Sequence, residues 1–347
     1  MPTPLPAEAA APADLAEQNA FMELSEGDAQ EDGTPEAINT FAWMHESDLP
    51  EAERGELMEA IGRMPCPPQS LRQLLAPDFM DRIGPVELAD LLHGEPLIAA
   101  KVLATVNASF YGLSTPVHNI EHAVAFLGME TVRNICVQYL MAQAFKPELT
   151  ASQHSFDSIW RASSIASELA LRLGKALGLP DYGSLATKVV LAFVGHLATA
   201  AMLPREVVNQ WLLRGRMERA QMEQEEIGLS AGEIGPMVLR LWGLPETLVN
   251  DVAHSSQVLV TPASTFDPES VPYLALIYLC VGLGERLALG DMFALAGYDL
   301  TEDRAHENHH LHAYLEHPAL AGLSEALNSP ALVEMVQQMR GGGASWP

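Results

Sequence analysis

The chain has 347 residues, which is enough for two domains of ordinary size or for one domain with extensions. Its formal net charge of −26 opposes binding to nucleic acids and to anionic membrane surfaces. The three cysteines are widely spaced and odd in number, so they indicate a reducing compartment rather than a disulfide framework. We therefore expect a cytoplasmic protein without a nucleic-acid or membrane partner.

The N-terminal region is strongly acidic. The first 60 residues hold 15 acidic side chains and one basic one, and so they carry −14 of the net charge. Residues 1–48 contain few large apolar side chains, which is typical of a segment that does not order itself, and they lack the basic and apolar parts of a secretory signal. We predict a disordered acidic arm that steers basic partners, folds back over the body or serves only as a solubilising tail.

From Pro65 onward the sequence is a succession of helical patterns, with almost no alternation of the strand type. One stretch places five apolar side chains on a single helical face: Val132, Ile135, Cys136, Tyr139 and Leu140. The longest apolar runs, 189–203 and 274–283, are too short or too interrupted to be expected to cross a bilayer. These patterns predict an all-α fold built from many short helices.

Several residues predict where helices begin and end. An apolar stripe over 159–177 stops at Gly178, a residue type common just past a helix C-terminus. Ser230 and Glu233 have the spacing of a capping box and predict a helix that ends at Gly243. The histidine-rich segment after residue 296 is predicted to form a helical extension with a frayed end.

Four segments follow one another in a characteristic order: "VELADLLHGEPLIAAKVLATVNASFYGL", "NIEHAVAFLGMETVRNI", "IWRASSIASELALRLGKALGL" and "VVLAFVGHLATAAMLP". Through these segments the chain resembles the HDOD family, bacterial relatives of the HD phosphohydrolases, over roughly residues 61–290. Six residues fall at the family's recurring positions: Asn107, Tyr111, Gly112, Leu127, Gly128 and Arg133. The resemblance implies an HD-like bundle over 49–295, with an N-terminal helical half over 61–147, a degenerate HD-like half over 155–290 and an extension over 296–347.

The resemblance also implies that the chain is not an enzyme. An HD hydrolase needs several His and Asp ligands, including an adjacent His-Asp pair, to hold two cations that activate water. Here the pair reads His196-Leu197, and Arg161 stands where the first histidine is expected. We expect no catalytic residue, no metal ligand and no cofactor, and we interpret His196 and His254 as structural.

Seven residues form our candidate surface for a partner or ligand: Asn107, Tyr111, Gly112, Arg133, Trp160, Arg161 and His196. For Asn107 and Arg133 the first interpretation is structural, through bonds to helix ends. The resemblance implies a regulatory module that acts through protein–protein interaction in bacterial signal transduction. The alternative is a sensor of nucleotides or cyclic dinucleotides, or a residual phosphohydrolase, in which Arg133 and Arg161 hold a phosphate. A third alternative is a self-associating scaffold.

Two further patterns permit other functions. The segment 121–138 has a helix, a glycine turn and a second helix with Arg133, Asn134 and Gln138, as in a DNA-reading helix-turn-helix, but the acidic charge of the chain opposes that function. In the C-terminal segment, four histidines include a pair at helical spacing: His306, His309, His310 and His312. These side chains either chelate a divalent ion or form a solvated, pH-responsive face.

Overall fold

The computed structural model describes residues 34–64, 69–76, 79–93, 95–108, 113, 115–145 and 150–341. The chain divides into two compact units, Met1–Phe41 and Ala42–Pro347. The described part of the first unit contains helix α2, Glu36–Thr40. Residues 1–33 of the predicted disordered arm lie outside the described residues.

The described residues of the second unit form helices and contain no β-strand, which confirms the all-α prediction. Its N-terminal helices are α3 (Glu51–Gly62), α4 (Gln69–Leu74), α5 (Phe79–Arg82), α6 (Pro85–His93), α7 (Pro96–Val106), α8 (Ile120–Leu127) and α9 (Met129–Ala144). The central helices are α10 (Thr150–Ala176), α11 (Tyr182–Met202), α12 (Arg205–Leu212), α13 (Arg216–Ile227), α14 (Ala231–Leu241), α15 (Glu246–Gln257) and α16 (Val271–Leu289). The predicted C-terminal extension contains α17 (His309–Leu315), α18 (Leu323–Leu327) and α19 (Pro330–Gly341), and residues 342–347 lie outside the described part.

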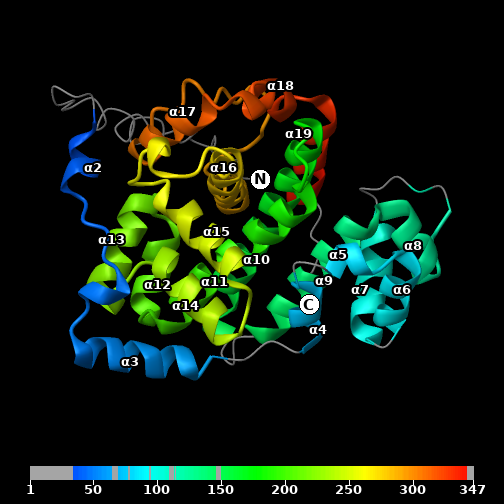
Figure 1. The fold of residues 1–347 in the computed structure, drawn as a ribbon, viewed down its shortest axis with the longest axis horizontal. Coiled ribbons are helices and arrows are strands. Elements are labelled where there is room, and N and C mark those ends of the chain that lie inside the picture. Colours follow the sequence, from blue (N-terminus) through cyan, green and yellow to red (C-terminus); the bar gives the residue numbers. More distant parts are fainter. Residues whose placement is uncertain are drawn as a thin grey trace, which may run out of the picture. The chain divides into compact units, whose positions relative to one another are not determined.

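The core of the second unit is built around α10, which packs against α11 and α16, while α11 also packs against α14 and α15 (Figure 1). Small residues allow α10 and α16 to approach closely: a Cβ on Gly284 would lie 2.7 Å from the Cβ of Ala166 and 2.5 Å from the carbonyl oxygen of Ala162. The buried residues of α10 include the predicted stripe members Ile159, Ala162 and Ala166. Helices α17, α18 and α19 complete the core by packing on α16 or α10.

Helices α11 and α16 are longer than the apolar runs in the sequence suggest. With 21 and 19 residues, they reach the length and apolar composition of a membrane-spanning helix. In the folded chain 72% and 78% of their apolar windows are buried inside the protein. Core helices of this kind pass the same test of length and composition, because the interior of a large helical protein is also apolar.

Helix α9 lies in the interior and contacts α4, α7, α8 and α11. Arg133, Asn134 and Gln138 on this helix are all buried. The amides of Asn134 and Gln138 donate to the hydroxyl of Ser167 on α10, at 3.2 and 2.5 Å. Helix α9 therefore does not present these side chains to a partner as the recognition helix of a helix-turn-helix does. Gly128, with φ of +83°, makes the corner between α8 and α9 that the sequence predicts.

Candidate functional site

A buried ion cluster joins three central helices at the position of the degenerate His-Asp pair. Glu285 of α16 accepts from Arg219 of α13 at 2.7 Å, and its other oxygen lies 3.2 Å from Nε2 of His196 on α11. Arg216, one turn before Arg219, lies 3.6 Å from the same carboxylate and donates to the Tyr278 carbonyl oxygen at 2.7 Å. We call Arg216, Arg219, His196 and Glu285 the arginine cluster.

The arginine cluster neutralises its charges only in part, since one carboxylate faces two guanidinium groups. Burial raises the pKa of Glu285, but Arg219, His196 and Arg216 outweigh this effect and hold that pKa well below its ordinary value. The carboxylate therefore stays ionised between the two guanidinium groups. The Arg216 guanidinium also stacks on the ring of Tyr278, with 4.0 Å between its central carbon and the ring centroid.

A second buried carboxylate, Glu223 of α13, caps the N-terminus of helix α14. It accepts from the indole of Trp211 at 2.7 Å and from the backbone N–H of Ala231 at 2.6 Å. Burial is the main cause of its raised pKa. The predicted capping box is wrong, because the Ser230 side chain makes no capping bond. Glu223 supplies the acceptor for the first turn of α14 instead, and Glu233 points to the N-terminal segment.

Two glycines set how closely α11 approaches α14, and so they place His196. A Cβ on Gly195 would lie 2.0 Å from the carbonyl oxygen of Ala231. A Cβ on Gly235 would lie 3.1 Å from the Cα of Gly195. Because both obstacles are backbone atoms, the two helices cross at this distance only when neither position has a side chain.

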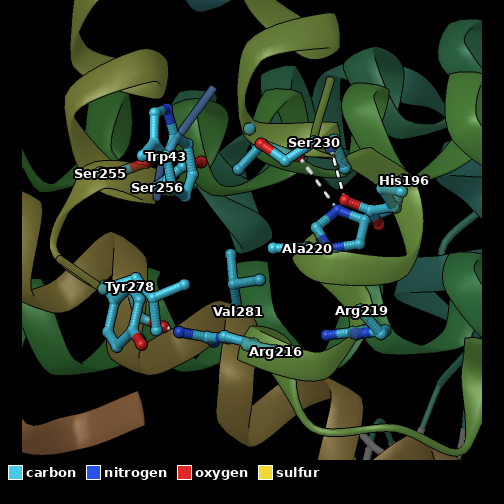
Figure 2. A pocket seen from close by; sticks show the side chains of 15 residues that line it. Trp43, His196, Arg216, Arg219, Ala220, Ser230, Ser255, Ser256, Tyr278 and Val281 are labelled. Carbon is cyan, nitrogen blue, oxygen red and sulfur yellow. Dashed lines mark hydrogen bonds between the residues drawn. The ribbon is translucent and has the colours of Figure 1, made fainter. Parts of the chain in front are cut away.

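A cavity of about 70 Å³ lies beside the arginine cluster. Figure 2 shows the Arg216 and Arg219 side chains on one side of it, and Trp43, Ser255 and Ser256 on another. The cavity is a small space with a mixed, mainly apolar lining, and the indole of Trp43 forms part of its wall.

The segment that carries Trp43 is the N-terminal strap, which we define as Ala42–Leu49. Its Trp43 indole donates to Glu233 at 2.8 Å, and His45 Nδ1 lies 3.1 Å from the same carboxylate oxygen. The side chain of Leu49 is buried. Residues 42–48 were predicted to be disordered, and the structure corrects that prediction. The acidic composition of this segment does not reveal that its indole and two of its backbone groups form hydrogen bonds with side chains of α13 and α14.

The residues that we predicted for the candidate surface do not form one site. His196 lines the cavity, whereas Trp160 and Arg161, which follow one another on α10, are absent from its lining residues. Trp160 is buried and Arg161 is exposed. Tyr111 and Gly112 lie outside the described residues.

Asn107 and Arg133 bond to the backbone near helix ends. Arg133 donates to the carbonyl oxygen of Leu74, the last residue of α4, at 2.7 Å. Asn107, just past the end of α7, donates to the carbonyl oxygens of Leu103 and Val117 and accepts from the Val117 N–H, at 2.7–2.8 Å. These bonds agree with the structural interpretation of both residues.

We expect Asn107→Ala to destabilise the folded chain by about 1–2 kcal/mol, because two hydrogen bonds to the Val117 backbone and one to the last turn of α7 are lost. Urea denaturation of the full chain measures this difference. The matched control is Asn209→Ala, an exposed position on α12, which should change the free energy of unfolding by less than about 0.5 kcal/mol. Equal stability of Asn107→Ala and the parent chain would contradict the structural role.

The side chains at the arginine cluster do not fit the two-metal centre of an HD hydrolase. Leu197 follows His196, and the carboxylate nearest to that histidine is already paired with guanidinium cations. Within the described ranges, no group of three or more His, Cys, Asp or Glu side chains is placed to hold a metal ion. Of the C-terminal histidines, His309 and His310 have ring centroids 5.0 Å apart, and His312 bonds the Asp303 carbonyl oxygen at 3.0 Å.

Sequence reasoning missed most residues of this site, although two signals were present. Arg216, Arg219 and Glu223 recur at helical spacing, which places them on one face of α13. Glu285 is the only carboxylate in the mainly apolar stretch from Val271 to Leu289, where Arg286 is the one basic residue. A charged residue in such a helix needs a buried partner.

Comparison with known proteins identifies the family of the chain. The family model of the HDOD domain matches residues 64–258, more than half of the chain. The chain therefore belongs to the HDOD family, as the sequence patterns predicted. No curated protein matches the chain.

Several crystal structures share the fold. An HDOD domain protein with unknown function from Geobacter sulfurreducens has a TM-score of 0.62 at 17% identity, over 84% of this chain and 97% of that chain. A candidate metal-dependent phosphohydrolase from Shewanella amazonensis SB2B has a TM-score of 0.51 at 17% identity, over 83% and 98%. A candidate signal transduction protein from Marinobacter aquaeolei VT8 has a TM-score of 0.54 at 21% identity, over 83% and 63%. At these identities the likeness shows the fold alone.

Proposed function

We propose that the protein is a non-enzymatic regulatory module that acts through protein–protein interaction in bacterial signal transduction. Its membership of the HDOD family supports this proposal, and one protein of similar fold bears the name of a signal transduction protein. The proposal includes a cytoplasmic location and a degenerate metal site.

The arginine cluster is the observation that carries the proposal. Arg219 and Arg216 supply positive charge beside Glu285, where a hydrolase would need room for divalent cations. A carboxylate paired in this way is a poor metal ligand, because a cation would have to displace both guanidinium groups. Because its carboxylate is paired with two guanidinium groups, the buried cluster stabilises the HD-like half instead of performing chemistry.

The alternative function, a nucleotide sensor in the same cleft, is less well supported. Sites for small molecules usually have roughly 300 Å³ or more, whereas the cavity measures about 70 Å³. Arg133, which was to hold the phosphate, donates to the Leu74 carbonyl oxygen instead. A nucleotide would enter only after the strap and several side chains had moved.

Elemental analysis tests the proposal on full-length protein purified without a chelator or a histidine tag, together with turnover assays on cyclic and linear dinucleotides. We expect well below one equivalent of metal per chain and no turnover. A panel of nucleotides in a thermal-shift assay, with and without manganese, tests the sensor alternative. Two metal ions per chain with turnover would overturn the proposal, and a saturable shift by one nucleotide would favour the sensor.

A further inference from the structure

The N-terminal strap lies in a surface that is shaped to receive an extended peptide. The side-chain amide of Gln224 on α13 pairs with the strap backbone twice: it donates to the Ala42 carbonyl oxygen at 2.9 Å and accepts from the Met44 N–H at 3.0 Å. Such a pair of bonds imitates the contact between neighbouring β-strands, so it recognises an extended backbone without regard to side chains.

Two glycines open space for the side chains of the strap. A Cβ on Gly232 would lie 2.8 Å from the indole Cη2 of Trp43, so the ring rests directly against the backbone of α14. Gly228, with φ of +93°, ends α13, and a Cβ there would lie 3.0 Å from Cδ2 of Leu49. The surface thus holds an aromatic residue and an aliphatic residue at the two ends of the strap, which forms a 3-10 turn over Glu46–Asp48 just before Leu49.

Carboxylates predominate around this surface, and His45 of the strap lies 3.1 Å from one of them, Glu233. The strap carries Glu46 and Asp48, and its indole is bonded to Glu233. Where the chain leaves the strap for α3, a hollow is lined by four carboxylates and one cation: Glu53, Glu56, Glu225, Glu226 and Arg63. Because carboxylates outnumber the cation here, a segment whose basic residues reach this hollow is attracted to it, whereas Glu46 and Asp48 bring the strap no positive charge.

We propose that the surface formed by Gln224, Gly228, Gly232 and Glu233 is a peptide-binding groove, which the strap occupies in the resting chain. A partner's extended segment, with an aromatic residue followed by basic residues, displaces the strap. This inference rests on the proposed function and specifies the class of partner. Because the strap is tethered, its effective concentration at the groove is of millimolar order, and a competing segment needs a higher intrinsic affinity.

Displacement would also change the cavity beside the arginine cluster, because Trp43 forms part of its wall. The same indole borders a second hollow that includes His45, His254 and Phe266. Removal of one side chain therefore joins the groove to both spaces. The two helices that carry the groove are also joined without the strap, because Glu223 of α13 accepts from the Ala231 N–H of α14.

Binding of labelled peptides to full-length protein tests this inference by fluorescence anisotropy. The first peptide has the sequence of residues 40–50, TFAWMHESDLP. The second carries Glu46→Lys and Asp48→Lys, and a third adds Trp43→Ala to the second. The proteins are the parent chain and the Trp43→Ala variant, in which the tethered competitor is weakened.

We expect the basic peptide to bind the Trp43→Ala chain about tenfold or more tightly than the parent chain, because the groove is more often vacant. Its advantage over the acidic peptide should shrink at high salt. The peptide without the indole should bind neither protein. Adding Gln224→Ala to the Trp43→Ala chain should weaken binding about tenfold, whereas adding Gln221→Ala, at an exposed position one turn earlier, should not.

The inference would be overturned if the basic peptide bound the parent and Trp43→Ala chains equally well. It would also be overturned if Gln224→Ala left the affinity unchanged, or if the peptide did not bind at all. Light scattering of the parent chain tests whether the strap of a second copy occupies the groove. Dimers that dissociate in the Gln224→Ala variant would support that arrangement and overturn occupation by the chain's own strap. Failure of the peptide experiment leaves the metal and turnover results unchanged, so it is distinguishable from failure of the proposed function.

Discussion

Glu285→Gln is expected to destabilise the protein by about 3–5 kcal/mol, because it leaves buried guanidinium groups without their compensating charge. Glu285 is 7% exposed, and its carboxylate is the shared partner of Arg219, Arg216 and His196. The amide that replaces it keeps the shape but removes the negative charge. Chemical denaturation of the full chain at pH 7 measures the effect.

Two further variants make this result specific to the arginine cluster. Glu269→Gln, at an exposed position before α16, should change the free energy of unfolding by less than about 0.5 kcal/mol. Adding Arg219→Met to Glu285→Gln should recover part of the loss, because one stranded cation is then removed. If the double variant were less stable than Glu285→Gln alone, charge pairing would not be the cause.

The low pKa of Glu285 also predicts an effect of acid. Because its pKa in the folded chain lies well below the ordinary value of 4.5, its contribution to stability is complete above that value. The contribution is lost as the pH falls from about 4.5 towards the lowered pKa. The stability difference between the parent chain and Glu285→Gln should therefore shrink over this range, and a constant difference would contradict the assigned ionisation.

Gly195→Ala should cost about 3 kcal/mol or more, at the upper end of what overpacking usually costs. The added methyl group would lie 2.0 Å from the carbonyl oxygen of Ala231, so α11 and α14 must separate. Gly55→Ala on α3 should instead raise the free energy of unfolding, because nothing lies within 4 Å of the new Cβ. There, alanine should stabilise the helix by about 0.5–1 kcal/mol. Thermal and urea denaturation compare the two variants, and similar values would contradict the close crossing.

The fold was predictable from the sequence because its signals are local. Apolar spacing marks the buried face of α10, and Gly128 and Gly178 mark helix ends with positive φ. The Ser230 capping box failed for a reason that no local pattern contains. Its place is taken by Glu223, which reaches the Ala231 N–H from another helix.

The site was predictable only in part, because pairing between distant segments decides it. The sequence singled out His196, but its partner Glu285 lies 89 positions later, in a helix that is apolar apart from Glu285 and Arg286. Trp43 appeared to be part of a uniformly acidic arm. Its partners on α14 become visible only when α14 has been placed in the fold.

The distance in sequence between the strap and its groove has a consequence for synthesis of the chain. Met44 bonds a residue that lies 180 positions later. At the usual rates of translation, about 5–20 residues per second, the strap leaves the ribosome roughly 10–40 seconds before α13 is complete. During this interval its indole has no groove to enter. In a nascent chain the Trp43 indole is therefore exposed to chaperones and neighbouring proteins. In a mature chain it is exposed in this way only when the strap is displaced.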